Sequence, residues 1–254
     1  MTRTLAQSLA WAADGAAHLR GMMMRMGADA FAAPSALPGW TRAHVLTHVA
    51  RNADAMVNLI TWARTGVRTP AYPSREHRDA EIEAGAQRAP DEIRAALLAS
   101  SDRLAAVVRG TPASAWSATV EAPRGGEMPA SEILWFRARE VWVHAVDLDA
   151  GASFADLPRP MLHELLTDAT TTFAARPDFP RLVLRPTDEA RSWSVGVDGS
   201  GTGAPGDGAD GASGGVTEVR GPAAELAAWL LGRSKGRSLR TAEGKRPGPL
   251  PGWM

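Results

Sequence analysis

The chain has 254 residues, which is enough for one large domain or two of ordinary size. Lys plus Arg and Asp plus Glu both number 28, and the resulting net charge of zero argues against a nucleic-acid partner, because proteins that bind the phosphate backbone usually carry a basic surplus. Cysteine is absent, which excludes disulfides, thiolate metal ligands and a protein thiol nucleophile, so any thiol chemistry must come from a small molecule.

Four stretches with a helical apolar period predict long helices in the first part of the chain. They cover about residues 4–26, 41–64, 90–109 and 129–150. Thr41 is the expected N-cap of the second helix, because it follows Pro38, Gly39 and Trp40. Four amphipathic helices of this length predict a bundle. The connection at residues 66–89 is long for a compact domain, so we expect it to be either disordered or functional.

The pattern changes in the second part of the chain. Helices are expected at residues 159–175 and 222–231, and three short runs between them have strand character. The runs are residues 182–185, 192–197 and 216–220. Between the last two lies a stretch of Gly, Ala, Ser and Asp at 199–215, which predicts a flexible loop. We therefore predict a mixed fold of two domains, an α-helical bundle at residues 1–152 and a small α+β domain at 153–254.

No segment contains the run of about 18 apolar residues that is needed to span a bilayer. Near the N-terminus, Gln7, Asp14 and His18 fall at helical spacing, whereas a secretory signal would have an unbroken apolar stretch and a cleavage site. We therefore expect a cytoplasmic protein with no membrane partner, and we expect it to be a monomer.

Glu140 and His144 are the first candidates for a chemical role. They lie four residues apart on the fourth predicted helix, so their side chains share one face, together with Ile133 and Leu148. That face is expected to point inward, where a carboxylate without a partner is costly. A metal ion would satisfy both groups. An ordinary Glu–His contact, or a salt bridge from Arg137 to Glu140, would explain the same spacing without a metal.

His48 adds a third candidate ligand, at the edge of the apolar stripe of the second predicted helix. Helical bundles build metal sites from facing helices, and two histidines with one glutamate leave a fourth position open, as in catalytic zinc sites. His44, four residues away, is a competing ligand, and Asp147 is a candidate acceptor for the second ring nitrogen of His144. The remaining histidines are expected to be surface or structural residues, and they are His18, His77 and His163.

Two segments carry a resemblance to a known family. They are GWTRAHVLTHVARN at residues 39–52 and EILWFRAREVWVHAVDL at residues 132–148. With RDAEI at 78–82 and LGR at 231–233, they resemble the mycothiol-dependent maleylpyruvate isomerase family, over almost the whole chain. The resemblance implies a DinB-like four-helix bundle followed by a sterol-carrier-like α+β domain. It also implies a divalent metal, expected to be zinc, on His48, Glu140 and His144, with His44 only a neighbour.

The implied activity is the cis–trans isomerisation of maleylpyruvate to fumarylpyruvate, a step of gentisate-type aromatic breakdown. A thiolate adds to the double bond, the resulting single bond turns, and the thiolate leaves again. Because the chain has no cysteine, the thiol is expected to be a small molecule, mycothiol in this family. The substrate is a dicarboxylate, for which arginine is a suited donor. Arg78 and Arg233 are therefore the expected catalytic arginines, with Arg233 bringing a charge of the second domain over the metal.

Three other functions fit parts of the pattern. A mycothiol S-transferase acting on another electrophile would share the metal site but would not need arginines for a dicarboxylate. A non-catalytic carrier would bind a lipid in its second domain and keep the metal as a structural ion. A structural or regulatory zinc bundle would have four protein ligands, with His44 or Asp147 completing the set.

Overall fold

The computed structural model describes residues 3–123, 125–197 and 215–251. It divides into two compact units, residues 1–152 and 153–254, and the predicted mixed fold of a helical bundle and a small α+β domain is confirmed. Apart from Gly215, the predicted glycine-rich loop lies outside the described residues. None of the described helices is both long and apolar enough to cross a membrane.

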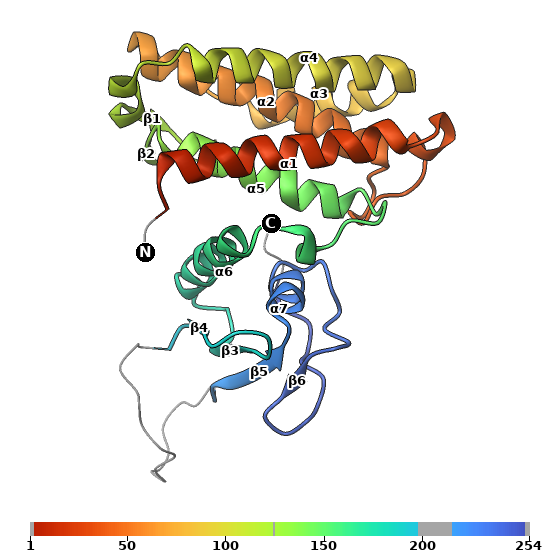
Figure 1. Ribbon diagram of the computed structural model, residues 1–254, viewed down its shortest axis with the longest axis vertical. Helices are drawn as coiled ribbons and strands as arrows, with labels where there is room; N and C mark the ends of the chain where they lie inside the picture. The colour runs from red at the N-terminus through yellow and green to blue at the C-terminus, as the bar shows by residue number, and fades with distance from the viewer. Residues whose placement is uncertain (1–2, 124, 198–214, 252–254) are drawn as a thin grey trace. The chain divides into compact units, whose positions relative to one another are not determined.

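The first unit is built around four long helices (Figure 1). They are α1 (Leu5–Arg25), α2 (Arg42–Thr65), α4 (Pro90–Arg109) and α5 (Glu132–Asp147), and each lies within a few residues of its predicted range. The hydroxyl of Thr41 accepts from the backbone N–H of His44 and so caps α2, as the sequence predicts. The helix ends at Gly66, whose φ of 72° is left-handed and favours glycine.

The connection between α2 and α4 contains a further helix, α3 (Arg75–Ala86), which the sequence analysis missed. Ile82 is the only buried residue of α3, so its apolar stripe is too thin to give a helical period. Ser74 begins the helix by accepting from the backbone N–H of His77 at 3.1 Å. The hairpin of β1 (Thr119–Glu121) and β2 (Glu127–Pro129) and the short 3₁₀ helices at Ala28–Phe31 and Ala113–Ser117 were not predicted either.

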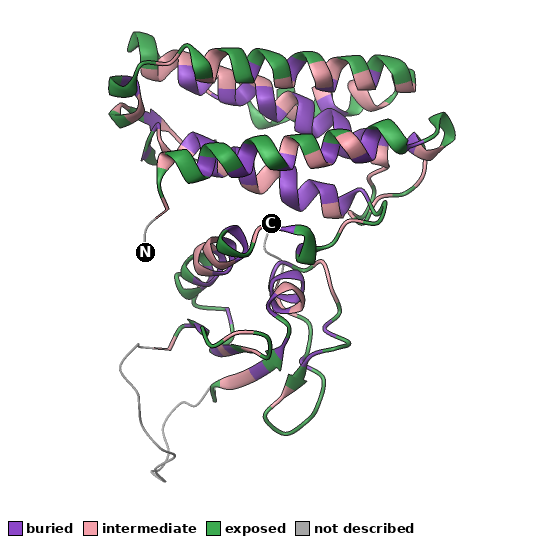
Figure 2. Ribbon diagram, in the orientation of Figure 1, coloured by how far each residue is buried: buried purple, intermediate pink, exposed green. Residues whose placement is uncertain are grey.

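The helices meet through buried faces (Figure 2). The largest side chains in these faces are completely or almost completely buried, among them Leu19, Leu46, Leu59, Ile60, Ile133, Leu134 and Trp135. α1 packs closely on α5, because Gly15 leaves room for the side chains of Val141 and Trp142. The indole N–H of Trp142 donates to the carbonyl of Trp11 at 2.9 Å. This contact fixes α5, which carries Glu140 and His144.

Hydrogen bonds join the start of α2 to the end of α5. The Nε of Arg42 donates to the carbonyl of Leu148 at 2.7 Å. The backbone N–H of Ala36, in the segment that leads into α2, donates to the carbonyl of Asp147 at 2.9 Å. These bonds bring the helix of His48 alongside the helix of His144.

The second unit combines two helices with a small sheet (Figure 1). Helices α6 (Arg159–Ala174) and α7 (Ala223–Leu230) pack against each other and against the strands. The strand order is β4-β3-β5-β6, formed by Trp193–Val195, Leu182–Pro186, Thr217–Gly221 and Arg240–Thr241. β3 and β5 are parallel, and the other two pairs are antiparallel. The predicted helices and strands of this unit are found; the two-residue β6 and the short 3₁₀ helix Phe154–Asp156 were not predicted.

Candidate metal centre

The three predicted ligands come together between α2 and α5. The Nε2 atom of His48 lies 2.8 Å from Oε2 of Glu140, and Nε2 of His144 lies 3.3 Å from the same oxygen. The three potential ligand atoms all lie within 4.8 Å of one another, and this is the one such group among the described residues. Both histidines are buried, while the glutamate side chain keeps 23% of its surface exposed. Glu140 therefore lies at the open side of the group.

The donor set fits a zinc ion. Zinc bonds of about 2.0–2.1 Å at tetrahedral angles would separate the ligand atoms by about 3.3 Å. The distance from His144 to Glu140 already has this value, and the distance from His48 to Glu140 is slightly shorter. Two imidazole nitrogens and one carboxylate oxygen leave a fourth coordination position, which is the pattern of catalytic zinc.

The charges of the group are strongly coupled. Burial by itself would raise the pKa of Glu140, but hydrogen bonds from His144 and His48 hold it well below its usual value. Burial would lower the pKa of His144, yet its hydrogen bonds to Asp147 and Glu140 outweigh this and raise the pKa to about 9. Burial is the main reason why the pKa of His48 is lowered. Without a metal, the site therefore holds a carboxylate beside one protonated and one neutral histidine.

Asp147 orients one of the histidines. The Nδ1–H group of His144 donates to Oδ2 of Asp147 at 2.9 Å, and the aspartate side chain is completely buried. This bond directs Nε2 of His144 towards Glu140 and is the arrangement that commonly supports a metal-ligating histidine. The predicted role of Asp147 as an acceptor for His144 agrees with this geometry.

His44 points away from the group. Its Nδ1 lies 2.7 Å from the hydroxyl of Thr41, and its Nε2 contacts Oε2 of Glu83 at 3.1 Å. Both ring nitrogens are thus engaged within α2 and α3. A structural zinc site completed by His44 would require breaking these contacts, so the geometry favours a site with three protein ligands.

Arg78, the first of the two predicted catalytic arginines, lies directly beside the group. It belongs to α3, and its NH2 group contacts Nδ1 of His48 at 3.2 Å. Because a guanidinium has only donors, Nδ1 must accept this bond, and the proton of the neutral imidazole lies on Nε2, facing Glu140. The Arg78 side chain keeps 26% of its surface exposed, so it also lies at the open side of the site.

Arg137 does not form the simple salt bridge to Glu140 that the sequence allowed as an alternative. Its NH1 group donates to the carbonyl of Val49 and to Oδ1 of Asn52, both at 2.8 Å. The side chain is buried, which lowers its pKa to about 10, and the charge of Glu140 counteracts this in part. Arg137 therefore remains a buried cation near Glu140 at neutral pH.

Two residues near the site were missed by the sequence analysis, Tyr72 and Asn52. The Tyr72 ring packs against the core of the first unit, and its centroid lies 5.8 Å from the central carbon of the Arg78 guanidinium. Tyr72 is the only tyrosine of the chain and lies in the connection at 66–89 that we expected to be disordered or functional. Asn52 lies one helical turn after His48. The place of Tyr72 in this connection and the spacing of Asn52 from His48 were the signals in the sequence that could have pointed to these two residues.

Trp40 forms an aromatic wall beside the histidines. Its ring centroid lies 5.6 Å from that of His48 and 6.1 Å from that of His44. The rings of His48 and His144 meet edge to face at 4.6 Å. The tryptophan was recognised as part of a motif, but a contact with the histidines was not predicted.

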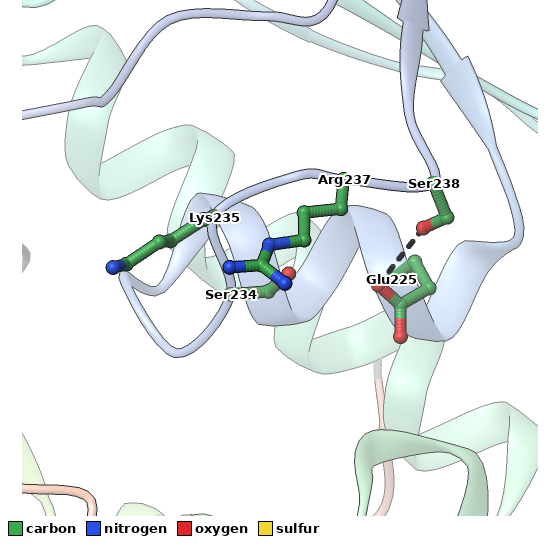
Figure 3. A pocket seen from close by; sticks show the side chains of 5 residues that line it. All are labelled: Glu225, Ser234, Lys235, Arg237 and Ser238. Atoms are coloured by element: carbon green, nitrogen blue, oxygen red, sulfur yellow. Dashed lines mark hydrogen bonds between the residues drawn. The ribbon is translucent and has the colours of Figure 1, made fainter.

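Arg233, the second predicted catalytic arginine, follows α7 in the second unit. Its NH1 group donates to the carbonyl of Leu231 at 2.8 Å. Four of the next residues line a shallow pocket together with Glu225 of α7 (Figure 3), and they are Ser234, Lys235, Arg237 and Ser238. The hydroxyl of Ser238 donates to Glu225 at 3.0 Å. The catalytic role of Arg233 stays a prediction.

The other three histidines have ordinary partners. His18 stacks on Trp142 with ring centroids 5.1 Å apart. His77 is exposed beside Glu81 on α3, and His163 contacts Glu189 in the second unit.

The chain is similar to known proteins over nearly its whole length. The family model of the mycothiol maleylpyruvate isomerase N-terminal domain matches residues 9–149, and that of the MDMPI C-terminal domain matches residues 156–250. A crystal structure of the mycothiol-dependent maleylpyruvate isomerase has 35% identity and a TM-score of 0.87, covering 100% of both chains. A histidine-to-alanine mutant of that enzyme has 34% identity, with the same TM-score and coverage. No curated protein matches the sequence. The resemblance carried by residues 39–52 and 132–148 is confirmed.

Proposed function

The chain belongs to the mycothiol-dependent maleylpyruvate isomerase family, and from this premise we propose that it converts maleylpyruvate to fumarylpyruvate with the help of zinc and mycothiol. One observation carries the proposal. Three ligand atoms from α2 and α5 converge on a point that keeps an open side, in a chain that has no thiol of its own. Such a site suits the binding of a small-molecule thiolate.

In this proposal, His48, Glu140 and His144 hold the zinc ion. Zinc would keep a bound thiol deprotonated near neutral pH, and mycothiol would supply the thiolate whose reversible addition lets the double bond of the substrate rotate. Asp147 holds the ring of His144 in the orientation that presents Nε2.

Arg78 binds one carboxylate of the substrate. Its guanidinium is at the open side of the site, where NH2 lies 3.2 Å from Nδ1 of His48 and NH1 donates to Asp79 at 2.6 Å. A bidentate pair with a substrate carboxylate would replace these two contacts. Arg233 is the proposed partner for the second carboxylate or for the negative charge that develops on the substrate. A transferase acting on an electrophile without two carboxylates would not need this pair of arginines.

The experiment compares purified wild-type protein with a His48→Ala variant. Zinc content is measured in both, and maleylpyruvate isomerisation is followed with and without mycothiol. We expect turnover that depends on mycothiol and is lost together with zinc in the variant. If zinc-loaded wild-type protein leaves maleylpyruvate unchanged, maleylpyruvate is excluded as the substrate and a mycothiol transferase is favoured. A wild-type protein that binds no metal would overturn the site itself.

A further inference from the structure

Helix α3 is attached to the first unit by one narrow face. Four of its residues lie at the i, i+3, i+4 and i+7 positions of that face, and they are Arg78, Glu81, Ile82 and Gly85. Of the whole helix only Ile82 is buried, and the helix packs on α2. Because most helices in proteins owe their place to a buried apolar face, the position of α3 must depend on a few individual contacts.

Two of these contacts are ion pairs near the surface. Oε1 of Glu81 lies 3.9 Å from NH1 of Arg51, and Oε2 of Glu83 lies 3.1 Å from Nε2 of His44. Both glutamate side chains are exposed, and exposed ion pairs of this kind contribute little to stability because water and salt screen them. They therefore do not fix the distance between α3 and α2.

The third contact is a close approach of the backbone of α3 to α2. Gly85 lies in the last turn of α3, and a Cβ atom on it would lie 2.5 Å from Cγ2 of Thr47. Thr47 is buried and β-branched, so its side chain has few other rotamers. The φ of Gly85 is not positive, so its conformation does not require glycine, and glycine costs a helix about 0.5–1 kcal/mol relative to alanine. The missing side chain therefore serves the close packing of the two helices.

The guanidinium of Arg78 is tied to the position of α3. Its NH1 group donates to Oδ1 of Asp79, on the same helix, at 2.6 Å. Its NH2 group contacts Nδ1 of His48 at 3.2 Å, which is the upper end of the usual range for a hydrogen bond. A Cβ atom at position 85 would have to move away from Thr47 by about 1 Å to reach an ordinary contact distance, and a misplacement of this size near reacting groups can lower a rate by about 100-fold.

We propose that Gly85 is a positioning residue, which lets α3 lie close enough to α2 to hold the Arg78 guanidinium at the open side of the metal group. This inference rests on the proposed isomerase function, in which Arg78 binds a carboxylate of the substrate. Gly85 acts only through the helix, so its effect should be reversed by any change that makes room for a Cβ atom and should disappear when Arg78 is absent.

The first test is the Gly85→Ala variant. We expect kcat/KM for maleylpyruvate to fall about tenfold or more, with zinc content unchanged, because the three ligands lie on α2 and α5. Adding Thr47→Ser removes Cγ2, the atom that the new Cβ atom would meet, and should restore most of the activity. The control is Gly21→Ala on α1, where only the flexible end of Arg25 lies close, at 3.3 Å. A double variant as impaired as Gly85→Ala would overturn the proposal.

A second comparison separates positioning of Arg78 from a general disturbance of the fold. In protein that already carries Arg78→Ala, the further change Gly85→Ala should lower kcat/KM by no more than about twofold, because the group that it displaces is gone. An equal loss from Gly85→Ala with and without Arg78 would show that Gly85 affects the site by another route, and the proposal would be wrong.

A measurement without turnover makes the placement of Arg78 testable by itself. Because Tyr72 is the only tyrosine, protein grown with 3-fluorotyrosine should give a single fluorine NMR resonance. The central carbon of the Arg78 guanidinium lies 5.8 Å from the Tyr72 ring centroid, so the resonance should depend on the position of this cation. Gly85→Ala should shift it in the same direction as Arg78→Ala, and the added Thr47→Ser should reverse the shift.

The two readouts distinguish failure of this inference from failure of the proposed function. A resonance that keeps its wild-type position in Gly85→Ala would overturn the positioning role. If the resonance shifts and reverts as expected but wild-type protein does not isomerise maleylpyruvate, Gly85 still places Arg78 beside His48, and only the isomerase function is overturned.

Discussion

The NH2 group of Arg78 contacts Nδ1 of His48 at 3.2 Å, and this contact is available only while that nitrogen carries no proton. A neutral histidine that binds a metal through Nε2 has its proton on Nδ1. Metal binding at Nε2 of His48 and the hydrogen bond from Arg78 therefore exclude each other. Binding of a metal ion at the site would therefore release the NH2 group of Arg78, which could then turn towards a substrate carboxylate.

Arg78→Ala should separate metal binding from activity. The change removes a cation beside the site and a hydrogen bond that competes with the metal, so zinc should bind at least as tightly as in the wild-type protein. Isomerisation should fall by about 100-fold or more, because a charged donor to the substrate is lost. Arg78→Lys should recover only part of it, since lysine lacks the planar fork.

The control for this variant is Arg68→Ala. Arg68 is an exposed arginine of the same connection. Its NH2 group lies 2.7 Å from Oε2 of Glu121, which is not part of the metal group. Its loss should leave both zinc affinity and turnover unchanged. Zinc affinity would be measured by competition with a chelating dye, and weaker zinc binding by Arg78→Ala would contradict the release of Arg78.

Zinc affinity should depend steeply on pH because of His144. In the metal-free protein its pKa is raised to about 9, so below pH 9 the histidine is protonated and zinc must displace this proton. Affinity should rise about tenfold per pH unit from pH 6.5 to 9 and then level off. His48 releases no net proton, because its pKa is lowered. Titration calorimetry in buffers of different ionisation enthalpy should detect about one proton released, and pH-independent affinity would refute this assignment.

Asp147→Asn tests how much the buried carboxylate supports His144. The amide can still accept from Nδ1, but it removes the negative charge that helps to raise the pKa of His144. Zinc affinity should fall by about 10- to 100-fold, as is common when the acceptor behind a ligating histidine is changed. The pH range in which affinity rises should also move to lower pH. An affinity equal to that of the wild-type protein at every pH would show that the charge has no such role.

The helices of the first unit could be predicted where their apolar faces are wide. α1, α2, α4 and α5 bury a stripe along most of their length, so the 3.6-residue period and the caps define them. The period fails for α3, which buries only Ile82 and owes its place to packing on α2. The family motif therefore predicted a functional role for Arg78, but the helix that carries this residue, α3, was not predicted.

The candidate site could be predicted only where its residues are close in the sequence. Glu140 and His144 are local neighbours on one helix, so their spacing alone brings them together. His48 is 92 residues from Glu140 in sequence, and its contact depends on the packing of α2 against α5. Tyr72 was not predicted, because its contact with Arg78 depends on how the connection between α2 and α4 is packed.

Gly15→Ala should destabilise the bundle where α1 meets α5. A Cβ atom at this position would lie 2.5 Å from Cγ2 of Val141 and 2.6 Å from the indole of Trp142, so the two helices must separate. Overpacking of this kind costs about 1–3 kcal/mol. Gly21→Ala in the same helix is the matched control, because only the flexible end of Arg25 lies close, at 3.3 Å. It should be neutral or stabilising by about 0.5–1 kcal/mol, since alanine favours helices.

Urea unfolding of the zinc-free proteins measures both effects without the contribution of the metal. Because Val141 and Trp142 lie between Glu140 and His144 on α5, a displacement of that helix should also weaken zinc binding in Gly15→Ala and not in Gly21→Ala. Equal stability and equal zinc affinity of the two variants would mean that α1 does not fix the position of α5. The close contact at Gly15 would then be a local feature of the bundle, and the orientation of Glu140 and His144 would depend on the bonds between α5 and α2, such as those from Arg42, Ala36 and Arg137.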